Sequence, residues 1–242
     1  QGLMGEEFGE RLNQIVRDSL EKGELYKSYD KNHILVDKSQ AFDIHVLVQG
    51  NDEDETLDFS SIFPVFKDEL EPFDFKVDAI DEWSNDAEAV FEGETFGNRL
   101  FGFYCTNYLG YKDKKLMGQT IKILPSIVSY KANILPEEQR SFKVDDGPLK
   151  GENIMITKSR FVIPKPEVDF EICEFMFPIL QIDKFTFDNN DVFKIRGSIP
   201  DEEENDVLFN VYINASNIEG KDELKVGEPF SGLGWLQAEI VS

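Results

Sequence analysis

The sequence predicts a mainly antiparallel β protein of the α+β class, with an N-terminal helix followed by two OB-like β-barrel modules in tandem. Apolar residues make up 40% of the 242 residues and include 21 Phe, and their short runs with Val and Ile favour strands. A single segment has clear helical periodicity. One order of strands and Gly turns occurs twice along the chain, which indicates an internal repeat.

The helix is predicted from Glu6 to Lys22. Its apolar positions recur every three or four residues: Phe8, Leu12, Ile15, Val16 and Leu20. This spacing gives one apolar stripe, and Gly23 stands where a helix commonly ends. We expect the stripe to cover the face of a sheet or one end of a barrel.

A β-hairpin is predicted next, from the runs at 33–36 and 42–48, which are joined by a short polar connection. The acidic run at 51–55 ends it as a solvated loop. The segment 59–70 is ambiguous, because Pro64 breaks any long helix there.

The internal repeat begins after this segment. The first copy consists of Ile80-Asp81, Val90–Gly93, Leu100–Tyr104, Leu116–Gly118 and Ile121–Leu124. The second copy consists of Ile182-Asp183, Phe193–Gly197, Leu208–Tyr212, Lys225–Gly227 and the terminal strand. Both copies run from a strand ending in Gly, through a strand ending in Tyr, to a Gly turn and a last strand. Ordinary hairpin composition is the alternative explanation.

Each copy has the strand content of a small Greek-key barrel of the OB type. The boundary between the modules is predicted in 136–151, where Pro, Gly and acidic residues gather, which gives domains 3–140 and 141–242. A further break is expected at 161–166, because of its two Pro residues, and a solvent loop at 201–206. The chain is expected to end in a strand pair, 224–230 and 231–240, joined by a Gly turn.

The segment from Ile182 to Tyr212, with Lys225-Val226-Gly227 and Trp235-Leu236-Gln237, resembles the C-terminal module of a family of uncharacterised bacterial proteins whose last strand reads W-L-Q-G. The stretch from Val90 to Ile123 resembles the first module of the same family, so the resemblance covers roughly 80–240. Ala238 stands where that family has Gly. The resemblance implies a bacterial cytoplasmic protein of unassigned activity, and it transfers no catalytic or binding residue.

The chain is strongly acidic, with 48 Asp and Glu against 25 Lys and Arg and a formal net charge of −23. Such a chain repels nucleic acid and anionic membranes, and its densest basic run, 111–115, contains an acid. Solubility alone explains much of this excess, and a basic protein or peptide is the partner that it favours. No run approaches the ~18 apolar residues of a membrane helix. The start of the chain lacks the pattern of a signal peptide, and Cys105 and Cys173 are expected to be free buried thiols, so the predicted location is the cytoplasm.

Motifs for phosphate loops, dinucleotide binding, HExxH or CxxC metal sites are absent from the sequence, so no catalytic, cofactor-binding or metal-binding residue and no cofactor is predicted. His45 is expected on the polar face of its strand rather than as a general base. Turns explain the acidic runs 145–147 and 188–191 better than calcium binding does. Core packing is the expected role of the strand aromatics Phe101, Phe103, Tyr104, Phe209, Tyr212 and Trp235.

The function that these observations favour is that of a non-enzymatic binding or interaction protein with a strongly acidic surface and a basic partner. The alternative is an OB-type protein that binds nucleic acid or oligosaccharide. A hydrolase that uses a carboxylate pair has the least support, since spacing in the sequence cannot show two acids facing each other.

Overall fold

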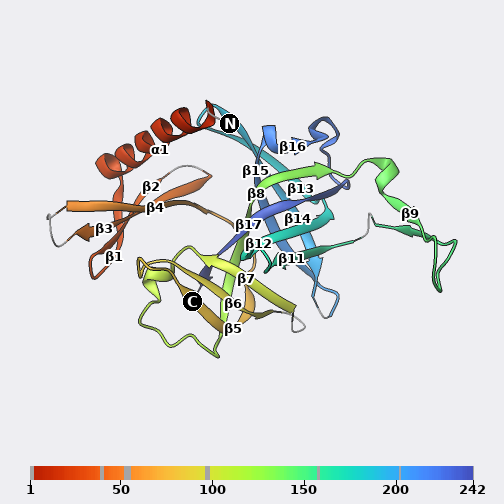
Figure 1. Cartoon of the computed structure of the whole chain (residues 1–242), viewed down its shortest axis with the longest axis horizontal. Helices are drawn as coiled ribbons and strands as arrows, with labels where there is room; N and C mark the ends of the chain where they lie inside the picture. Colours follow the sequence, from red (N-terminus) through yellow and green to blue (C-terminus); the bar gives the residue numbers. More distant parts are fainter. Residues whose placement is uncertain are drawn as a thin grey trace. The chain divides into compact units, whose positions relative to one another are not determined.

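The computed structural model describes residues 3–38, 41–51, 56–95, 99–156, 159–201 and 203–241, with the helix side chains described at position 10 and from position 12 onward. It is a mainly β protein with one α-helix, α1 (Leu3–Lys22), at its N-terminal end (Figure 1). Its residues form two compact units. The first comprises Gln1–Glu69, Glu82–Ala89 and Thr106–Lys114, and the second comprises Leu70–Asp81, Val90–Cys105 and Lys115–Ser242.

The first unit is built on a four-stranded antiparallel sheet. Its strands follow chain order: β1 (Glu24–Tyr29), β2 (Asn32–Lys38), β3 (Phe42–Asn51) and β4 (Thr56–Phe66). The predicted hairpin is therefore confirmed as β2 and β3, and most of the ambiguous segment 59–70 is the edge strand β4. Pro64 is accommodated there because a Pro at a sheet edge leaves no partner strand without a hydrogen bond.

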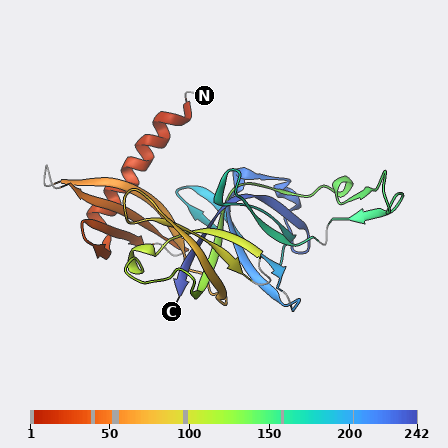
Figure 2. The ribbon, with the colours of Figure 1, turned by 60° about the horizontal axis from the view of Figure 1, so that its bottom comes forward.

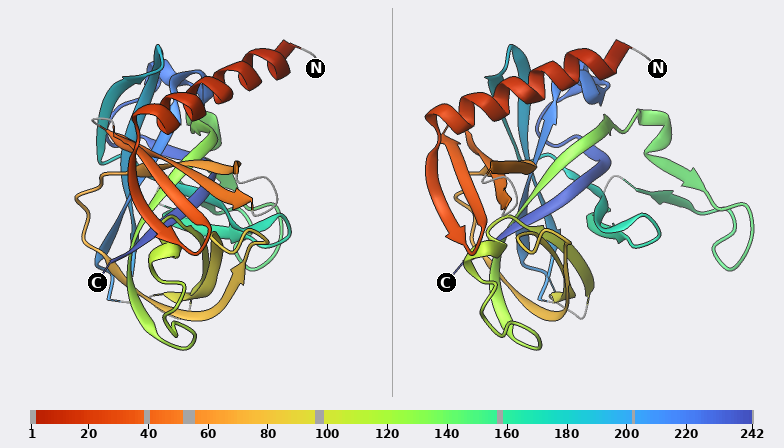
Figure 3. Two further views of the ribbon diagram at one scale, coloured as in Figure 1. Left: turned by 90° about the vertical axis from the view of Figure 1, so that its left-hand side faces the viewer. Right: turned by 60° about the vertical axis from the view of Figure 1, so that its left-hand side comes forward.

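The predicted helix is confirmed, and it leads directly into β1 (Figure 3). The amide of Gly23 donates to the carbonyl of Ser19 at 2.8 Å, which closes the last turn. The helix contacts β2 and β3, so it covers a sheet face as expected. Leu12, Ile15 and Val16 are half-buried and Leu20 is exposed, whereas the side chain of Phe8 lies outside the described part.

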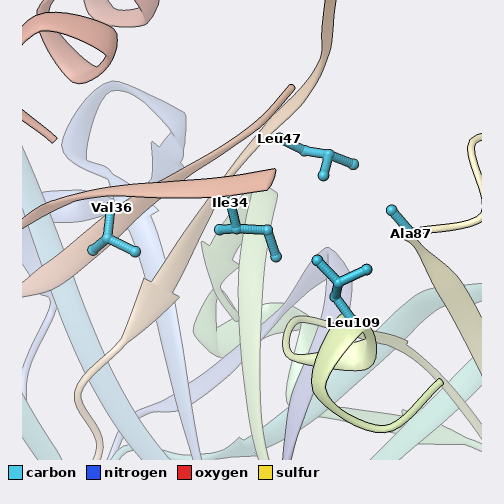
Figure 4. Close-up of a cluster of buried hydrophobic side chains, with 5 residues drawn as sticks. All are labelled: Ile34, Val36, Leu47, Ala87 and Leu109. Atoms are coloured by element: carbon cyan, nitrogen blue, oxygen red, sulfur yellow. The ribbon is translucent and has the colours of Figure 1, made fainter. Parts of the chain in front are cut away.

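A second layer of the first unit comes from two connections, 82–89 and 106–114, the latter containing the short helix η1 (Tyr108–Gly110). Ala87 and Leu109 from these connections join Ile34, Val36 and Leu47 of the sheet in one buried apolar cluster (Figure 4). The alternation of β2 explains this cluster, because Ile34 and Val36 point to the same side of the sheet.

The second unit contains an eleven-stranded mixed sheet within the described residues. Its strands are β5 (Phe73–Glu82), β6 (Ala89–Thr95), β7 (Arg99–Cys105), β8 (Thr120–Ile134), β11 (Phe161–Lys165), β12 (Asp169–Pro178), β13 (Gln181–Phe187), β14 (Asn190–Pro200), β15 (Asp206–Asn214), β16 (Ile218–Glu219) and β17 (Pro229–Val241). The short helices are η2 (Glu137–Gln139), η3 (Ala215–Asn217) and η4 (Lys221–Glu223). A separate two-stranded ribbon of β9 (Ser141–Lys143) and β10 (Asn153–Met155) extends away from the large sheet (Figure 2).

Part of this sheet is a ring in which β5, β6, β7, β17 and β8 are neighbours in turn and β8 returns to β5. Strands from both predicted modules thus belong to one mixed sheet that contains a ring of strands, rather than to two separate barrels. Two local expectations were wrong. The segment 161–166 is largely strand β11 rather than a break, and 229–241 is one long strand preceded by a turn rather than a pair of strands.

Corresponding segments of the internal repeat make corresponding hydrogen bonds. The amide of Gly118 (φ 73°) donates to the carbonyl of Val77, and the amide of Gly227 (φ 92°) donates to the carbonyl of Ile179, both at 2.8 Å. A positive φ at this turn requires Gly, because other residues meet steric strain there. The sequence similarity of the two turns therefore reflects the same local structure.

The Gly in the second strand of each copy, Gly93 in β6 and Gly197 in β14, also lies against a Phe ring in both copies. A Cβ atom on Gly197 would lie 1.9 Å from the ring of Phe177, and one on Gly93 would lie 2.8 Å from the ring of Phe75 and 2.0 Å from a backbone carbonyl. In each copy a Phe ring therefore occupies the space above the Gly. Both Phe rings are fully buried.

The two copies meet along β8 and β17, which are antiparallel to each other, and Ile127 pairs with Leu236 near the middle of the contact. The last strand of each copy also runs parallel to the third strand of the other copy, so that β17 pairs with β7 and β8 pairs with β15. The Tyr near the end of each third strand, Tyr104 in β7 or Tyr212 in β15, lies at this parallel junction. The central strands are therefore shared between the copies.

Candidate functional site

His45 is buried, with 4% of its surface exposed, and its ring lies 5.1 Å from that of Tyr26 and 5.5 Å from that of Phe63. Burial lowers its pKa to about 4, and Nδ1 has no hydrogen-bond partner within the described residues. The expected position on a polar face was wrong, because both faces of β3 are covered and Val46 and Leu47 are buried as well.

The two thiols are free and buried, as predicted for Cys105 and Cys173. Burial raises the pKa of Cys173 far above its ordinary value, so the thiolate that attacks or binds metal is not formed at neutral pH. In this environment the side chain acts as a small apolar group.

The strand aromatics form the core, as predicted. Buried rings are those of Phe101, Phe103, Tyr104, Phe209 and Tyr212. Trp235 is half-buried and its ring lies 4.8 Å from that of Tyr104. These rings are occupied by packing and offer no stacking platform for bases.

Four carboxylates, Asp81, Glu92, Asp169 and Glu171, form what we call the carboxylate cluster. Asp81 and Glu92 come from β5 and β6, and Asp169 and Glu171 begin β12. None of the four takes part in an ion pair within the described part of the chain, whereas other acids of the second unit, such as Glu174 and Glu228, pair with a Lys or Arg. The cluster is therefore an uncompensated concentration of negative charge.

The electrostatic coupling of the cluster appears in the pKa values of Glu171 and Glu92. The pKa of Glu171 is raised by burial, which outweighs a backbone hydrogen bond that lowers it, and the charges of Asp169, Asp81 and Glu92 raise it further. The pKa of Glu92 is raised by burial and by Asp81. The pKa of the neighbouring Tyr130 is raised by burial and then by Glu171. Each effect has the direction expected for like charges that share a partly desolvated place.

The position of the cluster follows from strand alternation. Phe91 and Phe103 stack inside the ring, with their centroids 5.4 Å apart, so Glu92 and its pairing partner Gly102 lie on the outside. A Cβ atom on Gly102 would lie 2.7 Å from the carbonyl of Phe170. The start of β12 thus crosses the outer face of β7 at Gly102, which brings its two acids near those of β5 and β6.

The second candidate is a groove of about 600 Å³ in the same unit. Its walls come from β8, β11, β12, β16, β17 and η3, with these side chains: Lys131, Asn133, Phe161, Glu174, Met176, Ser216, Asn217, Glu219, Ser231 and Leu233. Its volume is within the usual range of small-ligand sites. Charged, amide, hydroxyl and apolar groups all face it.

A smaller hollow of about 450 Å³ lies at the base of the β9–β10 ribbon. The guanidinium of Arg140 donates to the carboxylate of Glu228 and, at 2.9 Å, to the carbonyl of Leu135. These bonds anchor the ribbon to the large sheet, so we assign this hollow a structural role.

Comparison with protein-family models, with curated proteins and with solved structures finds no match to the chain. In the described residues, no group of three or more His, Cys, Asp and Glu side chains is arranged to hold a metal ion. None of the described helices is both long and apolar enough to span a membrane.

Sequence reasoning missed both the carboxylate cluster and the groove. Each depends on β12, which the sequence analysis did not predict, and each joins residues that are far apart in the chain. The one available signal for β12 was the alternation of Cys173, Phe175 and Phe177, which are buried, with exposed or half-buried neighbours.

Proposed function

We propose that this chain is a non-enzymatic binding protein that takes a basic segment of a partner protein at the carboxylate cluster. The observation that carries the proposal is that two partly buried acids, Glu92 and Glu171, lie with two exposed ones, Asp81 and Asp169, without an ion-paired Lys or Arg in the described residues. Mutual repulsion of this kind costs free energy, and an ammonium or guanidinium group would offset it. Arg and Lys side chains of a partner are the ordinary source of such groups in proteins.

We propose further that the two copies of the repeat are OB-like modules that share β8 and β17. Support comes from the five-stranded ring, since a five-stranded Greek-key barrel is the OB architecture. In that architecture the outer face of the second and third strands is a usual ligand face, and β6 and β7 are the second and third strands of the ring. Glu92 lies on that face. This analogy suggests a place for a ligand, and the acids indicate a cationic one.

A bacterial origin and a cytoplasmic location, together with membership of the W-L-Q-G family, complete the proposal. The buried free thiols are consistent with a reducing compartment. Nucleic acid is disfavoured as the ligand, since its phosphates would be repelled by the cluster.

The test is a calorimetric titration of the full chain with a lysine–alanine repeat peptide at several salt concentrations. We expect saturable binding that weakens as salt increases, since ion pairing at a surface is screened. The double variant Glu92→Gln, Glu171→Gln should weaken binding at least about tenfold, because two of the charges that attract the peptide are removed.

A matched control is the double variant Asp222→Asn, Glu223→Gln, which changes the net charge equally at two exposed acids of η4. We expect its affinity to remain within about twofold of the parent, allowing for the long-range field alone. Equal loss in the two variants would show that the peptide responds to overall charge only, and the proposal would then be wrong.

The groove favours one member of the alternative class, an oligosaccharide-binding protein, because its wall groups are amides and hydroxyls with charges that partly cancel. That possibility concerns a different place on the second unit and does not depend on the carboxylate cluster.

A further inference from the structure

We infer that the groove is a binding site for a short, neutral oligosaccharide. It is separate from the carboxylate cluster, so this inference stands or falls independently of the proposed cationic partner. The argument rests on how the groove arises, on its hydrogen-bonding groups, on its charge and on its apolar wall.

The groove exists because the sheet is locally irregular. Strand β15 pairs with β8 at 126–128 and β16 pairs with it at 132–133, while η3 lies outside the sheet between them. On the other side of β8, the register with β17 shifts between Leu233 and Gly234. Two interruptions at one level of β8 leave a hollow over an otherwise continuous sheet.

Amide groups on the groove wall are available to a ligand. The hydroxyl of Ser231 donates to Oδ1 of Asn133 at 3.0 Å, which fixes the amide and leaves its Nδ2 donor without a partner within the described residues. The single hydroxyl proton of Ser216 goes to Oδ1 of Asn214 at 2.7 Å rather than to Asn217, so the exposed amide of Asn217 is a second donor that is not held in one orientation. One fixed amide donor and one adaptable donor suit the hydroxyl oxygens of a sugar.

The charges of the groove partly cancel. Lys165 pairs with Glu174 at 2.9 Å and also with Glu167 at 3.0 Å, so one Lys is shared by two acids. Lys131 and Glu219 line the groove and contribute one charge of each sign. These groups leave a net of about one negative charge, so the groove offers little attraction to a basic peptide and none to a nucleic acid, which favours a neutral polar ligand.

The remaining wall is apolar and only half-buried. Phe161 pairs with Met176 across β11 and β12, and Leu233 pairs with Glu174 across β17 and β12. Sugars have apolar faces of CH groups and an equatorial rim of hydroxyls, so a site for them needs both kinds of wall. The groove supplies the apolar wall on β11 and β12 and the amide wall on β8 and η3.

The experiment is NMR of the full chain with ¹³C-labelled methionine methyl groups, titrated with maltotriose, cellotriose, xylotriose and tri-N-acetylchitotriose. Met176 lines the groove, whereas Met117 and Met155 are exposed elsewhere and serve as internal controls. We expect at least one of these sugars to shift the Met176 signal saturably while the signals of Met117 and Met155 remain in place.

Variants then identify the groups involved. Asn133→Ala and Asn217→Ala should each raise the dissociation constant for that sugar about tenfold, since each loses one ligand hydrogen bond. The matched control Asn153→Ala, at an exposed position of β10, should leave it unchanged. The variant Glu92→Gln, Glu171→Gln should also leave it unchanged, which separates this inference from the proposed function.

Two outcomes would overturn the inference. One is a panel in which no sugar moves Met176 at millimolar concentration while the protein is folded, as judged by its circular dichroism. The other is a saturable shift of Met176 with the lysine–alanine peptide or with single-stranded DNA instead of a sugar, which would assign the groove to a polymer of another class.

Discussion

Replacing His45 with Phe should remove a specific pH dependence of stability. The pKa of His45 falls from 6.5 to about 4 on folding because the ring is buried. Between these values the unfolded chain binds a proton that the folded chain does not bind. The contribution of the neutral ring to stability is therefore complete above pH 6.5 and is lost as the pH falls toward 4.

The magnitude follows from the same two values. At about 1.36 kcal/mol for each pKa unit, the full effect is about 3 kcal/mol, and about 2.5 kcal/mol of it is lost by pH 4.5. Phe suits the site, because Tyr26 and Phe63 already surround the ring and Nδ1 has no partner to lose within the described residues.

The assay is urea unfolding of the parent and His45→Phe proteins, followed by tryptophan fluorescence from pH 7.5 to pH 4.5. We expect the free energy of unfolding of the variant, relative to the parent, to rise by about 2.5 kcal/mol over this range. A control, Leu109→Ala, changes packing in the separate buried cluster without touching His45 and should differ from the parent by a constant amount. A constant difference for His45→Phe as well would refute the reasoning.

Three further predictions concern the packing at Gly197, the hydrogen bonds of Asn85 and the reactivity of Cys173. Gly197→Ala should lower the free energy of unfolding by about 2 kcal/mol or more in urea titrations, because its Cβ would lie 1.9 Å from the ring of Phe177, whereas Gly110→Ala, which has open space, should change it little. Asn85→Ala should destabilise the first unit by about 1–3 kcal/mol, because the side chain accepts from two backbone amides and donates at 2.9 Å to a Ser hydroxyl. The amides of 82–89 should then exchange their hydrogens faster, and an unchanged exchange rate there would contradict this. Cys173 should react with iodoacetamide only after urea unfolding, and rapid labelling of the folded chain would show that its burial is overstated.

The sequence was sufficient for elements whose pattern is local. The helix ending before Gly23 follows from a single apolar stripe, and the Asp188–Asp191 turn follows from residues that tolerate positive φ, which Asp188 and Asn189 adopt. The order of the repeat was also readable, because the turns at Gly118 and Gly227 require the same residue for the same backbone reason.

The sequence was insufficient wherever a strand finds its partner far along the chain. Strand β17 pairs with β7, β8 and β12, and nothing in its own residues specifies these three partners. The predicted position of His45 on a polar face was wrong for a related reason, since alternation predicts the two faces of a strand but cannot show that both are covered. The groove and the carboxylate cluster arise from these long-range pairings, so neither could be located in advance.

Strand β17 pairs with β7 and β8, and β8 pairs with β15, so hydrogen-bonded strands join the chain segments on either side of the β9–β10 ribbon. A cut in the ribbon would leave these strand pairs in place, because the ribbon belongs to a separate two-stranded sheet. We therefore expect that a chain cut within the β9–β10 ribbon would remain a folded, non-covalent pair of fragments, whereas either fragment made alone would expose open edges and aggregate.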